Sequence, residues 1–200
     1  MKVFQVYHLL ILLSLITTPS ALRYSKAGCK YTCGKVIIPY PFGIGANCSI
    51  NEWYVVNCNS SIPYLSALHH LEVLNVSLYN RTVTVNVPNI YNCQNQGQNT
   101  KQISSIDLGR SPFFFSKSRN NFVLKGCGNA LIMDHGTVVA GCSTSCTNYS
   151  SLSERNNCFG ISCCQTTIPH YLQSYSMNLT GLERQGGDVA CGSAFLVDNI

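Results

Sequence analysis

The chain has 200 residues and a formal net charge of +5, and only 10% of its residues are charged. This positive balance is too weak to indicate a nucleic-acid partner, and no predicted helix carries a basic stripe. The length is sufficient for one or two small domains with a hydrophobic core.

Residues 1–21 have the layout of a secretory signal peptide. Lys2 is followed by an apolar run at residues 9–16 and by small residues that end near Ser20 or Ala21. A membrane anchor is the alternative, but the apolar run is about half as long as a spanning helix requires. We expect removal of residues 1–21 and export of the rest, because no later segment is long and apolar enough to span. The 13 Lys and Arg then lose only Lys2, so 12 remain against 8 Asp and Glu.

The first element of the exported part is an apolar segment, VIIPYPFGIG, at residues 36–45. Residues 36–38 predict a strand, but the prolines and glycines after them exclude a helix or a central strand. Cysteines on both sides would hold this irregular segment, so that Tyr40 and Phe42 can fill a core. The alternative is an exposed aromatic platform for a ligand. A further strand is predicted at residues 53–57.

Residues 72–87 give the clearest pattern. Leu74, Val76 and Leu78 alternate with polar residues, and the same alternation resumes at residues 83–87 after a polar turn at residues 79–81. Alternation with a period of two on both sides of a turn predicts a β-hairpin with one buried face.

The rest of the chain reads as short strands and loops. Residues 91–100 are polar and predict a loop, and no stretch shows convincing helical periodicity. Strands are predicted at residues 113–115, 121–125, 137–140 and 194–197. The expected fold is therefore mostly β, disulfide-rich and glycosylated, an extracellular protein with long irregular loops and little helix.

The cysteines support an extracellular compartment. An even number of cysteines in an exported chain predicts a disulfide framework. A zinc site is the alternative, but the second half of a zinc finger is missing and the histidines are scattered, so we expect no metal and no other cofactor. All 12 cysteines follow residue 21: Cys29, Cys33, Cys48, Cys58, Cys93, Cys127, Cys142, Cys146, Cys158, Cys163, Cys164 and Cys191.

Two pairing predictions follow from the cysteine spacing. Cys48 and Cys58 flank one short strand and are predicted to close a local loop of about ten residues. Cys163 and Cys164 are adjacent, so a bond between them would need a strained peptide, and we expect different partners for the two. The remaining pairing stays open.

Six Asn-x-Ser/Thr sequons are predicted N-glycosylation sites. Sugars on them would supply solubility that the few charged residues do not. The sequons are Asn47, Asn59, Asn75, Asn80, Asn148 and Asn178.

These motifs together resemble the ectodomain of plant wall-associated receptor kinases. The first part, which resembles the galacturonan-binding domain, reads Cys29-x3-Cys33-Gly34, then Val36 to Ile44, then Cys48, Trp53-Tyr54 and Cys58. The second part, which resembles the associated cysteine-rich region, reads Gly126-Cys127-Gly128, Gly141-Cys142-Ser143-x2-Cys146, Cys158-Phe159-Gly160-x2-Cys163-Cys164-Gln165, Ile168-Pro169 and Ala194 to Val197.

The resemblance implies a galacturonan-binding-like domain at residues 22–100 and the associated region at residues 101–200. It also implies a location in the cell wall and binding of pectin, chiefly galacturonan stretches and oligogalacturonides. Such ectodomains are normally followed by growth-factor-like repeats, a transmembrane helix and a kinase. None of these precedes Ile200, so we expect a truncated product, a natural secreted form or a fragment, with membrane attachment only through a C-terminal extension.

Binding of galacturonan needs cations, because the polymer carries one carboxylate per sugar. Between residues 101 and 125 only Asp107 opposes five bases, and three phenylalanines at residues 113–115 lie among them. A solvated loop over a buried phenylalanine is the alternative. A weaker cluster, Arg23, Lys26, Lys30 and Lys35, is expected to be a flexible end. The candidate ligand-binding residues are Lys101, Arg110, Lys117, Arg119, Lys125, Tyr40, Phe42 and Trp53.

Catalysis is not expected. The few acids form no local motif for a glycosidase, and an even cysteine count offers no unpaired thiol. The alternative to carbohydrate binding is a secreted disulfide-rich protein-interaction or defence module. Salt dependence would separate the two, because contacts between Lys or Arg and pectin weaken with ionic strength and an apolar interface does not.

Overall fold

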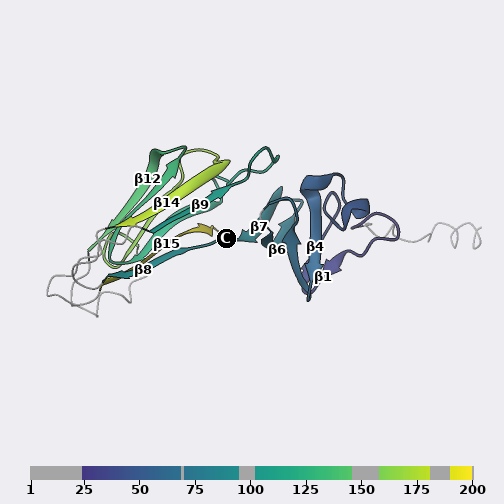
Figure 1. The fold of residues 1–200 in the computed structure, drawn as a ribbon, viewed down its shortest axis with the longest axis horizontal. Coiled ribbons are helices and arrows are strands. Elements are labelled where there is room, and N and C mark those ends of the chain that lie inside the picture. Colours follow the sequence, from purple (N-terminus) through teal and green to yellow (C-terminus); the bar gives the residue numbers. More distant parts are fainter. Residues whose placement is uncertain (1–23, 69, 95–101, 146–157, 181–189, 200) are drawn as a thin grey trace, which may run out of the picture. The chain divides into compact units, whose positions relative to one another are not determined.

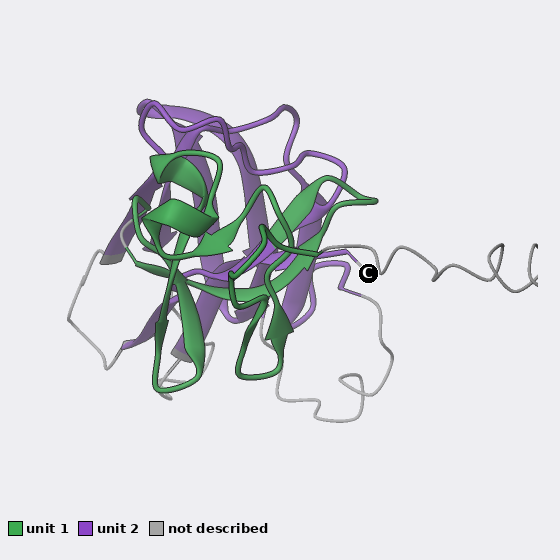
Figure 2. Cartoon of the chain, turned by 90° about the vertical axis from the view of Figure 1, so that its right-hand side faces the viewer, with its two compact units in different colours: residues 1–83 green, residues 84–200 purple. Residues whose placement is uncertain are grey.

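The structure is a computed structural model that describes residues 24–68, 70–94, 102–145, 158–180 and 190–199. The chain divides into two compact units, unit 1 at residues 1–83 and unit 2 at residues 84–200 (Figure 2). The described residues contain strands and two single-turn 3-10 helices, which confirms the mostly β class. None of their helices has the length and apolarity needed to cross a bilayer.

Unit 1 is built on a five-stranded sheet with the order β3-β4-β5-β6-β7. The parallel pair β3 and β4 is followed by antiparallel pairing of β4 with β5 and of β5 with β6. Its strands are β3 (Gly43–Ile44), β4 (Val55–Asn59), β5 (Ile62–Leu65), β6 (Leu71–Ser77) and β7 (Thr82–Asn86), the last of which crosses the boundary after residue 83. A small antiparallel pair and the two 3-10 helices complete the unit: β1 (Thr32–Cys33), β2 (Val36–Ile37), η1 (Ala46–Cys48) and η2 (Glu52–Tyr54).

The apolar segment between β2 and η1 contains no helix and no central strand, as predicted, and its only regular element is the short edge strand β3. Ile38 and Phe42 are buried, whereas Tyr40 between them is 39% exposed. The amide of Ile50 donates to the carbonyl of Pro41 at 3.0 Å, which attaches the segment to the chain after η1. Phe42 therefore fills the core as predicted, whereas the prediction that Tyr40 does so is wrong, because its side chain lies at the surface.

The predicted hairpin at residues 72–87 exists as β6 and β7, but the predicted buried face is wrong. Leu74 and Leu78 are each 50% exposed, while Leu71 and Val73 are buried. The strand begins at Leu71, one residue before the predicted range. Leu71 and Val73 are two positions apart, so their side chains lie on the same face of the strand. This face, and not the one that carries Leu74 and Leu78, packs on the core.

Unit 2 contains two four-stranded antiparallel sheets, with the orders β13-β10-β15-β8 and β12-β11-β14-β9 (Figure 1). Strands β10 and β13 of the first sheet contact β12 of the second. The first sheet contains β8 (Ile90–Gln94), β10 (Asn120–Gly126), β13 (Cys163–Thr167) and β15 (Ala190–Asp198). The second contains β9 (Gln102–Asp107), β11 (Gly128–Asp134), β12 (Thr137–Thr144) and β14 (Ser174–Thr180).

Alternating burial explains how these strands build one core. In β14 the side chains of Tyr175, Met177 and Leu179 are buried and their neighbours are not. Strand β10 differs, because Phe122 and the two residues after it are all buried, as expected for a central strand. Burying an apolar side chain of this size contributes about 1.5–3 kcal/mol.

The strand predictions in unit 2 have a mixed outcome. Those at residues 121–125, 137–140 and 194–197 are confirmed as β10, β12 and β15. The strand at residues 113–115 is wrong, because only an isolated bridge between Phe115 and Leu172 occurs there. The loop at residues 91–100 is also wrong at its start, since β8 extends to Gln94 and pairs with β15. The rest of that loop lies outside the described residues.

The disulfides correct one pairing prediction and confirm the other. Cys48 and Cys58 do not bond to each other. Each bonds instead to a cysteine that precedes the apolar segment. Cys163 and Cys164 do bond to different partners, and no described cysteine is free. The pairs are Cys29–Cys48, Cys33–Cys58, Cys93–Cys191, Cys142–Cys164 and Cys158–Cys163. Cys127 is also disulfide-bonded, and Cys146 lies outside the described residues.

Candidate functional site

A lysine with a fixed position is the main polar feature of unit 1. The ammonium of Lys26 donates to the carbonyl oxygen of Ser49 at 2.6 Å and to that of Asn47 at 3.4 Å. The same nitrogen lies 5.5 Å from the centroid of the Tyr40 ring, in a cation–π contact. The prediction of a flexible N-terminal end is therefore wrong for Lys26.

Three exposed tyrosines surround the segment that carries Lys26. The rings of Tyr24 and Tyr31 are stacked, with centroids 6.4 Å apart and an angle of 25° between their planes. The amide of Tyr40 donates to the carbonyl of Tyr24 at 2.6 Å. Tyr24 is 52% exposed and Tyr31 is 50% exposed. We call Lys26 with Tyr24, Tyr31 and Tyr40 the Lys26–tyrosine cluster.

Two other aromatic residues predicted for this unit are less accessible. Phe42 is buried and meets the edge of Tyr54, with ring centroids 5.0 Å apart. Trp53 is half-buried in η2, where its amide donates to the side-chain oxygen of Asn51 at 3.0 Å. Of Tyr40, Phe42 and Trp53, only Tyr40 takes part in the cluster.

The predicted basic segment of unit 2 includes a loop at residues 108–119, between β9 and β10. Lys101 lies outside the described residues. The amide of Phe115 donates to the carbonyl of Leu172 at 2.7 Å, and Leu172 returns a bond of 3.2 Å. The carboxamide of Gln173 donates to the carbonyl of Ser111 at 3.1 Å. The loop is therefore fixed along residues 171–173.

Lys117 is the cation of this loop that meets an aromatic ring. Its Nζ lies 5.7 Å from the centroid of Tyr171, and both side chains are exposed. Phe114 and Arg110 on the same loop are also exposed, and Arg119 is half-buried. This part of the predicted segment therefore contains one described contact between a cation and an aromatic ring, that of Lys117 with Tyr171.

Lys125 does not belong to that surface. It lies near the end of β10, where its Nζ is 5.8 Å from the Phe195 ring centroid. Arg119 precedes the start of the same strand, and six residues of extended chain place the two Cα atoms about 20 Å apart. The predicted basic segment is thus divided between two places on unit 2.

A histidine pair flanks one carboxylate in unit 2. The Nε2 atoms of His135 and His170 lie 3.6 Å and 3.3 Å from the two carboxylate oxygens of Asp134. Within the described ranges, no group of three or more His, Cys, Asp and Glu could hold a metal ion. Elsewhere, burial raises the pKa of the Tyr175 phenol, so this group stays neutral at physiological pH.

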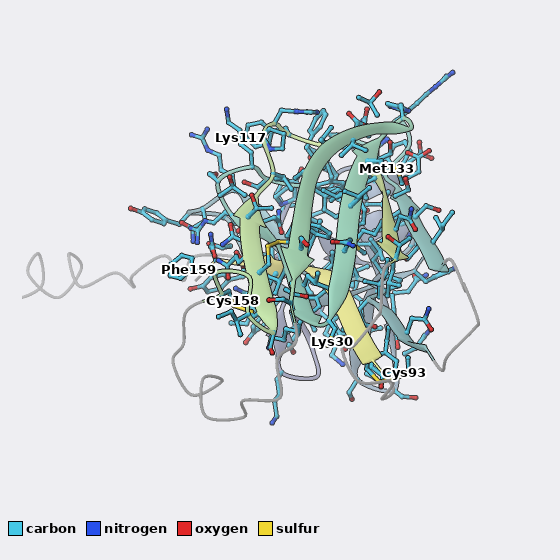
Figure 3. All side chains as sticks on the ribbon, turned by 90° about the vertical axis from the view of Figure 1, so that its left-hand side faces the viewer. Lys30, Cys93, Lys117, Met133, Cys158 and Phe159 are labelled. Atoms are coloured by element: carbon cyan, nitrogen blue, oxygen red, sulfur yellow. A yellow bond between two sulfur atoms is a disulfide. The ribbon has the colours of Figure 1, made fainter. Side chains whose placement is uncertain are left out.

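A disulfide-closed loop presents the most exposed apolar side chain among the described residues of unit 2. Cys158 bonds to Cys163, and Phe159 next to it is 88% exposed. In Figure 3, Phe159 and Lys117 occupy separate positions on the unit. Backbone bonds of 2.7 Å from Gly160 to the Cys163 carbonyl and 2.9 Å from Ser145 to the Gly160 carbonyl hold the loop.

The predicted sequons differ in accessibility. Asn47, Asn59, Asn75 and Asn80 are exposed. Asn178 lies within β14 between two neighbouring strands, and its side-chain oxygen is buried without a hydrogen-bond partner. Asn148 lies outside the described residues. Four sequons thus have the accessibility that a glycan requires.

Sequence reasoning did not select Tyr24, Tyr31 and Tyr171. Tyr24 and Tyr31 flank Lys26 in a stretch assigned to a solvated end. Cys29 could have indicated that this stretch is ordered, because a disulfide-bonded cysteine restricts the residues on either side of it. Tyr171 had no signal, since its contact with Lys117 joins segments more than fifty residues apart in sequence.

Comparisons with known proteins find sequence similarity over most of the chain. Residues 29–87 match the family model described as wall-associated receptor kinase galacturonan-binding. From Arabidopsis thaliana, wall-associated receptor kinase-like 6 is 33% identical over 86% of the chain, and wall-associated receptor kinase-like 5 is 34% identical over 86%. The chain spans only 30% and 26% of the lengths of these proteins. No solved structure matches the chain significantly.

Proposed function

Because this chain is homologous over most of its length to wall-associated receptor-kinase-like proteins, we propose that it is a pectin-binding ectodomain of that kind. The observation that carries the proposal is the match of residues 29–87, most of the described part of unit 1, to the galacturonan-binding family model. The ligand is the galacturonan of the plant cell wall, including oligogalacturonides, and the protein acts outside the cell.

The charges of unit 1 support an anionic ligand. Its described residues contain four Lys and Arg against the two acids Glu52 and Glu72. Each galacturonate carries one carboxylate, and a charge-assisted hydrogen bond to Lys or Arg is about twice as strong as a neutral one. The disulfide framework supports an extracellular location, because such bonds persist in oxidising compartments.

We expect de-esterified oligogalacturonide to bind the secreted protein and to lose affinity steeply with salt. Raising the ionic strength from 0.1 M to 1 M shortens the Debye length from about 10 Å to about 3 Å. This screening removes most of the interaction between exposed charges. Calorimetry at both ionic strengths measures the effect, with fully methyl-esterified fragments of equal length as the control. Equal binding of charged and esterified ligands would contradict electrostatic recognition.

The loop at residues 108–119 of unit 2 is a proposed contact for the same ligand. Lys117→Ala combined with Arg119→Ala should weaken oligogalacturonide binding at low salt and change the unfolding free energy by only about 0.5 kcal/mol, as is usual for surface positions. The loss should shrink at high salt, where screening already removes the interaction.

The control for this double variant is Lys125→Ala, which removes another lysine that lies over an aromatic ring. Lys125 was also a predicted ligand-binding residue, but it lies about 20 Å along β10 from Arg119. A larger effect of Lys125→Ala would move the contact to the β10–β15 face. Unchanged affinity of the double variant at low salt would exclude the loop.

A second candidate function is protein interaction or defence, and Phe159 is the observation that favours it. An exposed aromatic side chain on a rigid loop resembles the anchors that dominate protein interfaces. Binding through Phe159 would be insensitive to salt and lost in Phe159→Ser, whereas pectin binding would persist in that variant.

A further inference from the structure

We propose that the Lys26–tyrosine cluster is the galacturonan-binding site of unit 1, where Lys26 binds a uronate carboxylate and the tyrosine rings pack against the sugars. This inference rests on the proposed function and names its binding residues. It differs from the sequence prediction, which assigned Lys26 to a flexible end and gave Tyr24 and Tyr31 no role.

The cation of the site is preorganised and has no acidic partner. Two backbone carbonyls, those of Ser49 and Asn47, hold the Lys26 ammonium in place. An ammonium carries three donors, so one N–H remains for an external acceptor. Among the described residues, no carboxylate lies within ion-pair distance of Lys26 Nζ. A ligand carboxylate would therefore meet an unneutralised positive charge.

The tyrosines provide the apolar half of a sugar site. Tyrosine presents a broad ring face together with a hydroxyl group, so it can pack against sugar C–H groups and hydrogen-bond to their hydroxyls. The stacked rings of Tyr24 and Tyr31, with Tyr40 beside Lys26, place three exposed rings on one short stretch of surface. Aromatic surface of this extent next to a fixed cation suits a ligand that is both cyclic and anionic.

The backbone around the cluster is fixed before any ligand binds. The Tyr31 carbonyl accepts from the Ile38 amide at 2.7 Å, and the Tyr24 carbonyl accepts from Tyr40. The hydroxyl of Ser25 donates to the Cys29 carbonyl at 3.0 Å, and Cys29 is bonded to Cys48. Little conformational entropy is then lost on binding, which favours affinity.

Charge complementarity identifies the ligand class. The exposed residue Lys30 follows Lys26 closely in sequence, whereas unit 1 contains Glu52 and Glu72 as its described acids. Tyr31 and Tyr40 lie inside the matched range 29–87, and Lys26 lies three residues before it. We therefore assign the site to a chain of unesterified uronates.

The first test removes the ammonium and keeps its aliphatic stem. Lys26→Met in the full secreted chain should lower the affinity for a de-esterified oligogalacturonide at least about tenfold, since hydrogen bonds to charged groups are the stronger ones. The matched control, Lys35→Met, removes the same charge from the β1–β2 turn and should change the affinity less than about threefold. Equal losses in the two variants would show unspecific attraction and overturn the site.

The second test removes a ring and leaves every charge in place. Tyr31→Ala should weaken binding without changing its salt dependence, whereas Lys26→Met should make binding less salt-dependent. These different signatures persist even if Lys26→Met lowers the stability of unit 1 by freeing the Ser49 carbonyl. Unchanged affinity in Tyr31→Ala together with unchanged affinity in Lys26→Met would overturn the site alone. Absence of binding by the wild-type chain would instead overturn the proposed function and this inference with it.

Discussion

Gly43→Ala is expected to destabilise unit 1 by about 3 kcal/mol or more, at the upper end of overpacking effects. A Cβ atom at Gly43 would lie 2.2 Å from the carbonyl carbon and oxygen of Cys48 and 2.5 Å from the amide nitrogen of Ser49. Those atoms are backbone, and the disulfide to Cys29 holds them, so they cannot move aside cheaply. Chemical denaturation of the purified variant measures the loss.

The control for this variant is Gly28→Ala in the same unit. Gly28 has a φ of +80° but nothing within 4 Å of its Cβ position, so only the left-handed backbone opposes alanine, at about 1–2 kcal/mol. A loss for Gly43→Ala no greater than that for Gly28→Ala would mean that the β3–η1 region adapts to the added atom.

The second large effect concerns the bond between Cys33 and Cys58. Replacing both cysteines with alanine should lower the unfolding free energy by about 3.5 kcal/mol, as the chain-entropy relation gives for a closed loop of this length. The bond spans 25 residues and Cys33 is fully buried. Unfolding should be followed in denaturant under non-reducing conditions, after peptide mapping has confirmed that Cys29–Cys48 is intact.

A shorter disulfide in unit 2 provides the comparison. Cys158 and Cys163 are separated by five residues, and the same relation gives about 2 kcal/mol for removing their bond. The order of the two losses is the test, because it depends only on loop length. A greater loss from removing the short loop would show that native packing, and not loop closure, determines the effect.

Local patterns in the sequence predicted much of the fold. The alternation around residues 72–87 predicts two strands, but two nearly equivalent apolar sets compete there, and only the packing of Leu71 and Val73 decides the buried face. Strand β14 carries the same alternation but was not predicted, since its serines and Asn178 weaken the apolar signal.

Cysteine pairing could not be predicted in unit 1 because it depends on tertiary structure. Cys48 and Cys58 are close in sequence, yet the irregular segment turns Cys48 toward Cys29 and leaves Cys58 for Cys33. The adjacent pair at residues 163 and 164 was predictable, since local geometry alone excludes a bond between neighbours.

The candidate site could likewise be predicted only where it depends on local sequence and not on tertiary structure. Composition indicated cations near aromatic residues, and the loop at residues 108–119 contains them. Lys26 gained its position from two carbonyls more than twenty residues away, which no local pattern reveals. The contact of Lys117 with Tyr171 also depends on the tertiary fold.

The bond between Cys93 and Cys191 determines how unit 2 would respond to mechanical load. It joins β8, the first strand of the unit, to β15, the last, across a sequence separation of 98 residues. Tension applied to the two ends of the unit passes from one strand to the other through the sulfur atoms and bypasses the chain between them. Without the bond, unravelling that chain would release about 330 Å of length at roughly 3.4 Å per residue. With it, the chain between Cys93 and Cys191 carries no tension, and the load falls on the segments outside the bond, which include the part of β15 that pairs with β10.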